Sequence, residues 1–446
     1  MRRRIPPEPR SLGWRRLLAE RRNPIAVNLL ARLGALASLA LTSLLVARTS
    51  GPAGVGVLVL LRVLPWVAGL VLSGGLYGAA PYFLSGPGRA EPRYRATLAA
   101  MAVVAGLAGG ILWVGMSPVL GPRFLPELPL VLVAAAGVSV VTQVLESTAK
   151  ACSQGFNDLM GSNRIIVLEE FLFLPIYGLL LASGIDAYVA MVVALPLGDL
   201  GTAIPGWIRL GRRGYFTGAG RPSMALVRRV VAYGFRAQIG SVVLLLNARL
   251  DFALVGAMVG PFALGIYAVA SRYAELLRLP ALAMNYVLYP SYARDGGTIA
   301  AAKARAMIPR MGWVPAAAAA PLALAAPLVL PLVYGPSFRA AVVPAWVLLL
   351  GLSAGGVSGI VSAFLSADGR PGLNSAAMAA GLVVTVALDL ALIPSFHVTG
   401  AAVASSVAYV TTTTVLLACF RATTGAKNRP ESRAVETDGS MAEVPK

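Results

Sequence analysis

Charged side chains, cysteine and histidine are all scarce in this sequence of 446 residues. Only 13% of the residues are charged, whereas an average soluble domain has about 25%. The two cysteines, Cys152 and Cys419, cannot build a disulfide framework. A single histidine leaves little for a metal site or for nucleophilic catalysis, and no metal-ligand spacing is present. The sequence therefore predicts a protein without catalytic residues, metal or cofactor.

Two sequence signals of common enzyme classes are also missing. No glycine-rich loop followed by Lys-Ser or Lys-Thr is present, which excludes a nucleotide-binding ATPase. No long connection carries the paired carboxylates that a membrane glycosyltransferase needs for acid–base work. Polymerase or glycosyltransferase activity therefore remains only as a weaker alternative to transport.

Apolar residues dominate instead. Hydrophobic residues make up 57% of the chain, and the mean hydropathy is +0.74. Apolar runs of about 20 residues, the length that crosses a bilayer as a helix, recur along the sequence. We therefore predict an all-α polytopic membrane protein with about twelve spans. The predicted spans are 25–47, 55–84, 96–118, 128–149, 165–183, 187–208, 231–258, 262–289, 311–333, 340–366, 373–394 and 397–420.

Lysine and arginine are distributed unevenly over the predicted connections. The N-terminus and every second connection hold 29 of the 38, the opposite connections hold three, and six lie within spans. The positive-inside rule then places both termini in the cytoplasm. This distribution accounts for the net charge of +19 without nucleic acid as a partner. Thirty-four Arg against four Lys indicate a GC-rich bacterial genome, so we expect the membrane to be the bacterial cytoplasmic membrane.

Two landmarks repeat along the chain and predict an internal duplication. GPxxxG occurs at 51–56 and at 260–265, and GPxF occurs at 121–124 and at 335–338. The two offsets are nearly equal, and six spans separate the copies. We therefore expect two six-helix lobes of like orientation, related by a pseudo-two-fold axis along the membrane normal. The predicted divisions are a basic N-terminus (1–24), an N-lobe (25–208), a basic linker (209–230), a C-lobe (231–420) and a disordered tail (421–446).

Positive charges inside predicted spans are the first candidate site residues. A mid-span Arg costs roughly 2.5–3.5 kcal/mol on insertion scales, so each needs a partner, water or a ligand. We expect these residues to line a cationic cavity between the lobes that binds an anionic substrate. The candidates are Arg32, Arg62, Arg249, Arg272 and Arg278, with Asn247, Asp251 and Glu275 on the same faces.

Structural alternatives exist for most of these residues. Arg272, Glu275 and Arg278 also fit a buried ion-pair cluster on one helix face, and Arg249 with Asp251 fits the end of a span. Arg32 is near enough to the cytoplasm for its side chain to reach the headgroups. Arg62 has no acidic neighbour on its own helix, which favours a role in binding.

Acidic residues supply the second set of candidates. Asp199 and Asp389 lie deep in predicted spans without a local partner, so each is a candidate for binding a coupling ion or for pairing with an Arg of another span. Glu146 precedes Lys150 by one helical turn and fits a helix ion pair. Glu169 and Glu170 fit the first turn of a helix, where carboxylates are favourable.

ALDLALIP at 387–394, followed by GAAVA at 400–404, is similar to the pattern LNLxLIP…GAAxA. Through this pattern the sequence resembles bacterial polysaccharide exporters and O-antigen flippases of the multidrug/oligosaccharidyl-lipid/polysaccharide exporter superfamily. Arg249 to Ala268 is similar to RxDxxxxGxxxGxxxxGxYA, and 334–338 to YGxxF. Asp389 departs from this pattern, because the family usually has Asn there.

The resemblance implies a flippase that moves an oligosaccharide linked through pyrophosphate to a polyprenyl lipid. Its partners would be the anionic lipid-linked saccharide, membrane lipids, and a polysaccharide polymerase or glycosyltransferases. A multidrug or small-molecule antiporter of the same superfamily is the alternative, although organic cations would prefer an acidic cavity to a cationic one.

Overall fold

The computed structural model describes residues 24–85, 91–278, 288, 292 and 297–427. These residues are helical apart from short turns, and no strand occurs among them. Eight helices in this part of the chain are long and apolar enough to cross a membrane. The all-helical membrane class predicted from the sequence is thereby confirmed, while the count of twelve spans in two six-helix lobes stays a prediction.

Two of the long helices contain a kink. The helix α2 (Pro24–Leu72) has a non-helical residue at Gly51 with φ 63°, a backbone conformation that glycine adopts easily. The helix α16 (Pro371–Lys427) is interrupted at His397, with φ 49°. Each kink lies where the sequence predicts a connection between two spans, so each of these helices consists of two segments.

The chain divides into two compact units. Unit 1 comprises residues 1–49 and 61–239, and unit 2 comprises residues 50–60 and 240–446. The helices α2 and α10 (Met224–Met258) therefore each contribute to both units.

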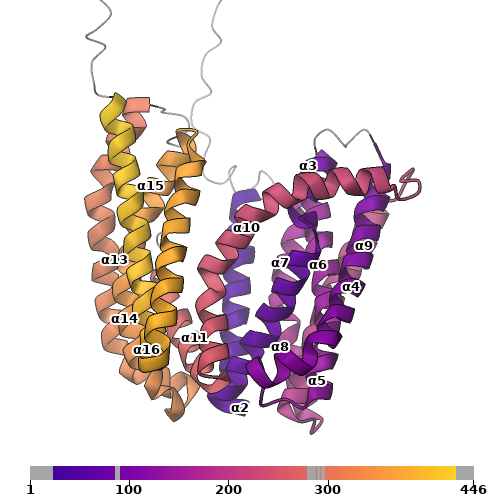
Figure 1. The fold of residues 1–446 in the computed structure, drawn as a ribbon, viewed down its shortest axis with the longest axis horizontal. Coiled ribbons are helices and arrows are strands. Elements are labelled where there is room, and N and C mark those ends of the chain that lie inside the picture. The colour runs from indigo at the N-terminus through magenta and orange to yellow at the C-terminus, as the bar shows by residue number, and fades with distance from the viewer. Residues whose placement is uncertain (1–23, 86–90, 279–287, 289–291, 293–296, 428–446) are drawn as a thin grey trace, which may run out of the picture. The chain divides into compact units, whose positions relative to one another are not determined.

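Unit 1 is built around the helix α6 (Gly137–Gly155), which packs against helices on several sides. Its neighbours are seen in Figure 1. They are α3 (Leu76–Ser85), α4 (Arg93–Phe124), α5 (Leu130–Ala135), α7 (Leu159–Phe171) and α9 (Ala187–Arg212), with α8 (Phe173–Ala182) packed on α9. Glycines allow the close approach of α4 and α6, since a Cβ on Gly110 or Gly137 would meet atoms of the other helix.

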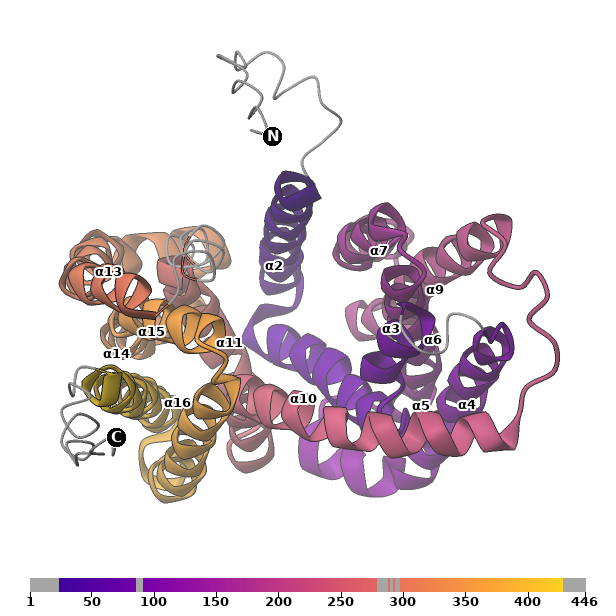
Figure 2. The same cartoon turned by 90° about the horizontal axis from the view of Figure 1, so that it is seen from above.

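In unit 2, four helices lie next to one another and are seen end-on in Figure 2. They are α13 (Gly297–Tyr334), α14 (Val342–Ser353), α15 (Gly355–Ala367) and α16. The helix α11 (Pro261–Glu275), continued by a 3-10 turn η1 (Leu276–Arg278), packs on α14, and a second 3-10 helix η2 (Pro336–Ala341) precedes α14. Phe364 and Phe420 meet edge to face in the core of this bundle.

The two GPxxxG segments contact each other within unit 2. A Cβ added to Gly56 would overlap the carbonyl oxygen of Pro261, and a Cβ added to Gly265 would overlap that of Pro52. The contact is reciprocal, because the sixth residue of each copy, a glycine, faces the second residue of the other copy, a proline. The duplication inferred from sequence spacing thus has a physical counterpart at this contact.

Candidate functional site

Arg62 forms an ion pair inside unit 1. Its Nη1 donates to Oε2 of Glu170 at 2.5 Å, and its guanidinium carbon lies 5.4 Å from the ring centroid of Phe173. The side chains of Arg62 and Glu170 are 19% and 24% exposed. The Nε of Arg62 is buried, and it has no hydrogen-bond partner among the residues that the structure describes. Within this part of the chain, Arg62 donates a hydrogen bond to a carboxylate through Nη1 and none through Nε.

Glu170 is positioned by three helical segments. It lies at the C-terminal end of α7, next to the junction with α8 that carries Phe173. The Ser38 hydroxyl of α2 donates to the backbone oxygen of Glu170 at 2.7 Å, which ties this junction to the first segment of α2. Because the backbone of Glu170 is held in this way, its carboxylate is directed by local structure as well as by Arg62.

A second cation, Lys150, bridges two carboxylates next to this pair. Its Nζ lies 2.7 Å from Oε2 of Glu169 and 3.9 Å from Oε1 of Glu146. Glu146 is 2% exposed, and its Oε1 has no hydrogen-bond partner in the described part of the chain. The Glu146–Lys150 helix pair expected from the sequence is present, but Glu169 makes the shorter contact.

Asp199 completes this group. Its Oδ2 accepts a hydrogen bond of 2.7 Å from the Thr142 hydroxyl, and it lies within the electrostatic reach of Arg62. Thr142 lies one helical turn from Glu146 on α6. We call Arg62, Lys150, Glu146, Glu169, Glu170 and Asp199 the unit 1 ion network. With two cations and four carboxylates, the network is net negative when all of its members are ionised.

The helix position of Glu169 and Glu170 differs from the one expected. The sequence suggested that they lie in the first turn of a span, but α7 begins at Leu159, more than two turns earlier. Asp158 is the residue that caps this helix, by accepting from the backbone N–H of Gly161. The two glutamates instead face cations of other helices.

Asp158 also holds the loop between α6 and α7 to the end of α9. It accepts two hydrogen bonds from Arg209, at 2.6 and 3.0 Å, and lies 3.2 Å from Arg213. Burial raises the pKa of the Asp158 carboxyl, but the hydrogen bonds from Arg209 and Gly161 outweigh burial and keep the pKa below its ordinary value. This residue is a structural anchor outside the spans.

In unit 2, the two ends of the Arg249–Ala268 motif segment meet at Asp251, together with the residue that follows GAAVA. Its Oδ2 accepts a hydrogen bond of 2.6 Å from the Tyr267 hydroxyl and lies 3.3 Å from the Ser405 hydroxyl. Its Oδ1 accepts from the backbone N–H of Phe252. Asp251 belongs to the RxD segment, Tyr267 to the GxYA segment, and Ser405 directly follows GAAVA.

Asp389 is the least satisfied acidic residue of the described chain. It is fully buried, and neither of its carboxylate oxygens has a hydrogen-bond partner among the described residues. The carboxyl group of Asp251 is near enough to interact electrostatically with that of Asp389. A buried carboxylate without a partner must bind a proton, a cation or water, since an isolated buried charge is very unfavourable.

Two of the remaining candidate cations lie over aromatic rings. Arg249 lies over the ring of Phe252 at 5.0 Å, and Arg278 lies over the ring of Tyr409 at 5.5 Å. Glu275 and Arg278 form the expected i,i+3 ion pair at 4.0 Å, across the junction of α11 and the 3-10 turn η1. Their side chains are 34% and 49% exposed, so this pair is not fully buried.

Arg272 lies half-buried on α11, and its positive charge interacts electrostatically with the hydroxyl group of Tyr334. The side chains of Arg32 and Asn247 lie outside the described residues. In the part of the chain that the structure describes, no group of three or more His, Cys, Asp or Glu side chains is arranged to hold a metal ion.

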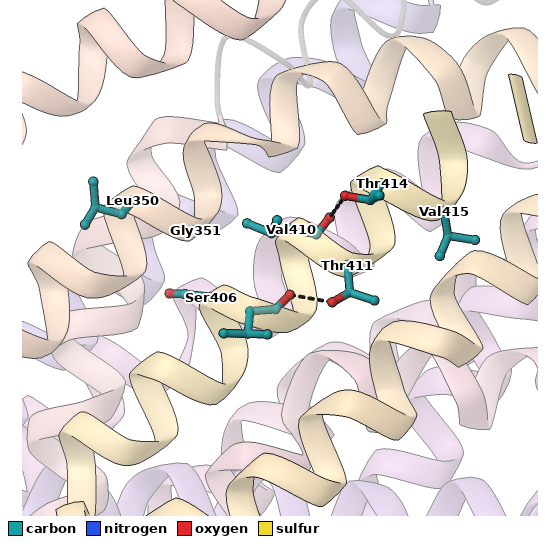
Figure 3. Close-up of a pocket in the computed structure, with 8 residues that line it drawn as sticks. Leu350, Gly351, Ser406, Val410, Thr411, Thr414 and Val415 are labelled. Carbon is teal, nitrogen blue, oxygen red and sulfur yellow. Dashed lines mark hydrogen bonds between the residues drawn. The ribbon is translucent and has the colours of Figure 1, made fainter. Parts of the chain in front are cut away.

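An apolar groove of about 440 Å³ lies in unit 2 between α14 and α16 (Figure 3). Thr411 and Thr414 each donate to the carbonyl oxygen four residues earlier in α16, at 2.8 and 2.9 Å. Ser406 donates to a carbonyl oxygen of α14 at 2.8 Å. The hydroxyl protons of the groove are thus used within the protein, so the groove suits a hydrocarbon chain better than a sugar or a phosphate.

Comparison with known proteins agrees with the resemblance found in the motifs. The model of a family described as "Polysaccharide biosynthesis protein" matches residues 95–294. No curated protein matches the sequence significantly.

Among solved structures, an inward-facing multidrug resistance transporter of the MATE family, in the MOP superfamily, has a TM-score of 0.71 at 15% identity. The alignment covers 92% of this chain and 99% of that chain. The lipid II flippase MurJ, in an inward closed conformation, has a TM-score of 0.72 at 13% identity, with 89% and 87% covered. The resemblance to polysaccharide-biosynthesis proteins is therefore supported over residues 95–294, and the chain shares its fold with these two transporters.

Proposed function

We propose that the protein is a flippase that moves a polyprenyl-pyrophosphate-linked oligosaccharide across the bacterial cytoplasmic membrane for cell-surface polysaccharide synthesis. The match of residues 95–294 to a polysaccharide-biosynthesis family is the observation that carries this proposal. The fold shared with a lipid II flippase supports it. Translocation by alternating access of two lobes requires no covalent step, so neither catalytic residues nor a cofactor are needed.

Arginines inside the spans would recognise the pyrophosphate. Arg62, Arg249, Arg272 and Arg278 carry the charge for this role, because guanidinium groups form strong, often bidentate hydrogen bonds with phosphate oxygens. Arg32, Asn247, Asp251 and Glu275 would line the same path. The lipid tail would remain in the bilayer, where the groove between α14 and α16 offers an apolar surface.

Asp389 is the stronger of the two ion-coupling candidates. Its oxygens have no hydrogen-bond partner among the described residues, whereas Asp199 accepts a hydrogen bond from Thr142. A proton or a monovalent cation bound at Asp389 would remove the cost of burying this carboxylate. Binding there would thereby link an ion gradient to transport.

The test uses proteoliposomes and fluorescent lipid-linked saccharide, with flipping measured as loss of accessibility to an external reductant. We expect Arg62→Ala and Arg272→Ala each to lower the initial rate on the order of tenfold, the effect of losing a charge-assisted contact. Arg123→Ala and Arg339→Ala, in exposed outer positions of the two units, serve as matched controls. Unchanged rates in both Arg62→Ala and Arg272→Ala would remove the assigned site.

A cation antiporter is the second candidate function. The excess of carboxylates in the unit 1 ion network favours it, because an acidic interior suits an organic cation. Deletion of the gene distinguishes the two: loss of surface polysaccharide supports the flippase, and sensitivity to lipophilic cations supports the antiporter.

A further inference from the structure

Arg62 is already bound to an anion, and that anion belongs to the protein. A site intended for pyrophosphate would be expected to keep its guanidinium free, yet the Glu170 carboxylate lies 2.5 Å from Nη1. The pairing joins residues 108 positions apart, so it is a property of the folded unit rather than of a helix.

We propose that Glu170 is an internal competitor for the anion site at Arg62. In the absence of cargo its carboxylate occupies Arg62, and a cargo phosphate must displace it. Glu170 thereby sets the minimum charge that a cargo must carry. This inference rests on the proposed function, since it concerns how the same arginine selects its anion.

The guanidinium of Arg62 has a donor that Glu170 does not use. A guanidinium has five N–H donors, and an anion that is held through two of them binds more strongly than one held through a single contact. Glu170 is hydrogen-bonded through Nη1, whereas the buried Nε has no hydrogen-bond partner among the described residues. Phe173 lies near the guanidinium carbon and helps to keep the group in place. A phosphate that engages the Nε edge gains a contact that Glu170 does not make.

Glu170 can leave without becoming an isolated charge. The hydrogen bond from Ser38 holds its backbone and not its carboxylate, so the carboxylate can leave Arg62 without breaking that bond. About a quarter of that side chain is exposed. Lys150 lies within electrostatic reach of Glu170 and offers a second cation to the displaced carboxylate.

The charge of the surroundings makes the exchange selective. When all four carboxylates of the unit 1 ion network are ionised, they outnumber its two cations, and an incoming anion is then repelled unless its attraction to Arg62 is strong. A monophosphate carries little more charge than the carboxylate that it replaces. A pyrophosphate carries more charge and more acceptor oxygens, so it gains more from the exchange.

The experiment measures binding of farnesyl pyrophosphate and farnesyl monophosphate to the full-length protein in detergent. Glu170→Gln keeps the size of the side chain and removes its charge. We expect this variant to bind the monophosphate on the order of tenfold more tightly than the wild type, the effect of removing one like charge from a half-buried site. Binding of the pyrophosphate should tighten less, so that the preference for pyrophosphate falls.

Three further variants complete the design. Glu127→Gln makes the same chemical change at an exposed position of unit 1 and should leave both affinities unchanged. Arg62→Ala should weaken pyrophosphate binding, and Arg62→Ala with Glu170→Gln should show no gain from the second change. If Glu170→Gln does not fold, Glu170→Asp, which withdraws the carboxylate from Arg62, should lower the same preference.

The outcomes separate the two ideas. An unchanged preference in the folded Glu170 variant, with weaker binding in Arg62→Ala, would overturn the competitor role and leave the flippase proposal standing. Equal binding of pyrophosphate by the wild type, Arg62→Ala and Arg272→Ala would overturn the anion site itself.

Discussion

The buried charged side chains of the two units differ in their partners. In unit 1, Arg62 and Lys150 are each paired with carboxylates, and Asp199 accepts a hydrogen bond. In unit 2, Asp251 has three donors around it, whereas Asp389 has none among the described residues. A buried charged group that is paired can remain ionised, while an unpaired buried carboxylate must take up a proton or a cation. On the proposed function, we expect a coupling ion to bind at Asp389 in unit 2 and the competition between Glu170 and the cargo phosphate to take place at Arg62 in unit 1.

The strongest way to break this comparison is to neutralise Asp389. We expect Asp389→Asn to lower gradient-driven flipping on the order of tenfold, within the range of coupling free energies between sites. The matched variant Asp199→Asn should have a smaller effect, because Thr142 still provides a hydrogen-bond partner. Initial rates in proteoliposomes with an imposed proton or sodium gradient measure both. A larger loss in Asp199→Asn would reverse the assignment of the units.

Removing the ion pair between Arg62 and Glu170 tests how much this pair contributes to the free energy of unfolding. Arg62→Ala leaves Glu170 half-buried without its partner, which should lower the free energy of unfolding by about 1–3 kcal/mol. Glu170→Ala in the same chain should recover part of that loss, since the uncompensated charge is then gone. Thermal unfolding in detergent of the two single variants and the double variant gives the coupling energy. Additive effects would show that the pair contributes nothing of its own.

The reciprocal glycine contact provides a test confined to unit 2. Gly265→Ala would force a methyl group against the Pro52 carbonyl, so we expect destabilisation of about 1–3 kcal/mol from overpacking. Gly372→Ala is the control, because nothing lies within 4 Å of its added Cβ. Equal melting temperatures of the two variants would contradict the packing described here.

The smallest expected effect concerns Asp158 in unit 1. Asp158→Asn should cost about 1 kcal/mol at pH 7, through a weaker cap and weaker bonds to Arg209. Because the pKa of Asp158 is lowered by folding, its stabilisation is complete above the pKa of the unfolded chain, about 4. The stabilisation is lost as the pH falls further, through the pKa of the folded state. The difference in melting temperature between wild type and variant should therefore shrink in acid, and a constant difference would argue against an ionic role.

Local patterns predicted the parts of the structure that depend on neighbours in sequence. The apolar runs predicted helices, the repeated glycines and prolines marked the connection in which the kink at Gly51 lies, and Asp389 stood out because no partner is within one helical turn. The contact between the two GPxxxG segments was not predicted. The pairing of Arg62 with Glu170 could not be predicted, because it depends on how distant helices pack. The same holds for Asp251 with Ser405, 154 positions apart. The motifs that contain or adjoin these residues can be recognised in the sequence, but the sequence does not show that the residues are in contact.

The contact between the two GPxxxG segments has an implication for the origin of the fold. Gly56 against Pro261 and Gly265 against Pro52 form an isologous contact, the kind that two identical subunits make across a two-fold axis. A half-length ancestor carrying one such segment could make the same contact as a homodimer, before fusion joined the copies. Expressing the two halves as separate polypeptides and asking whether they reassemble would examine that history directly.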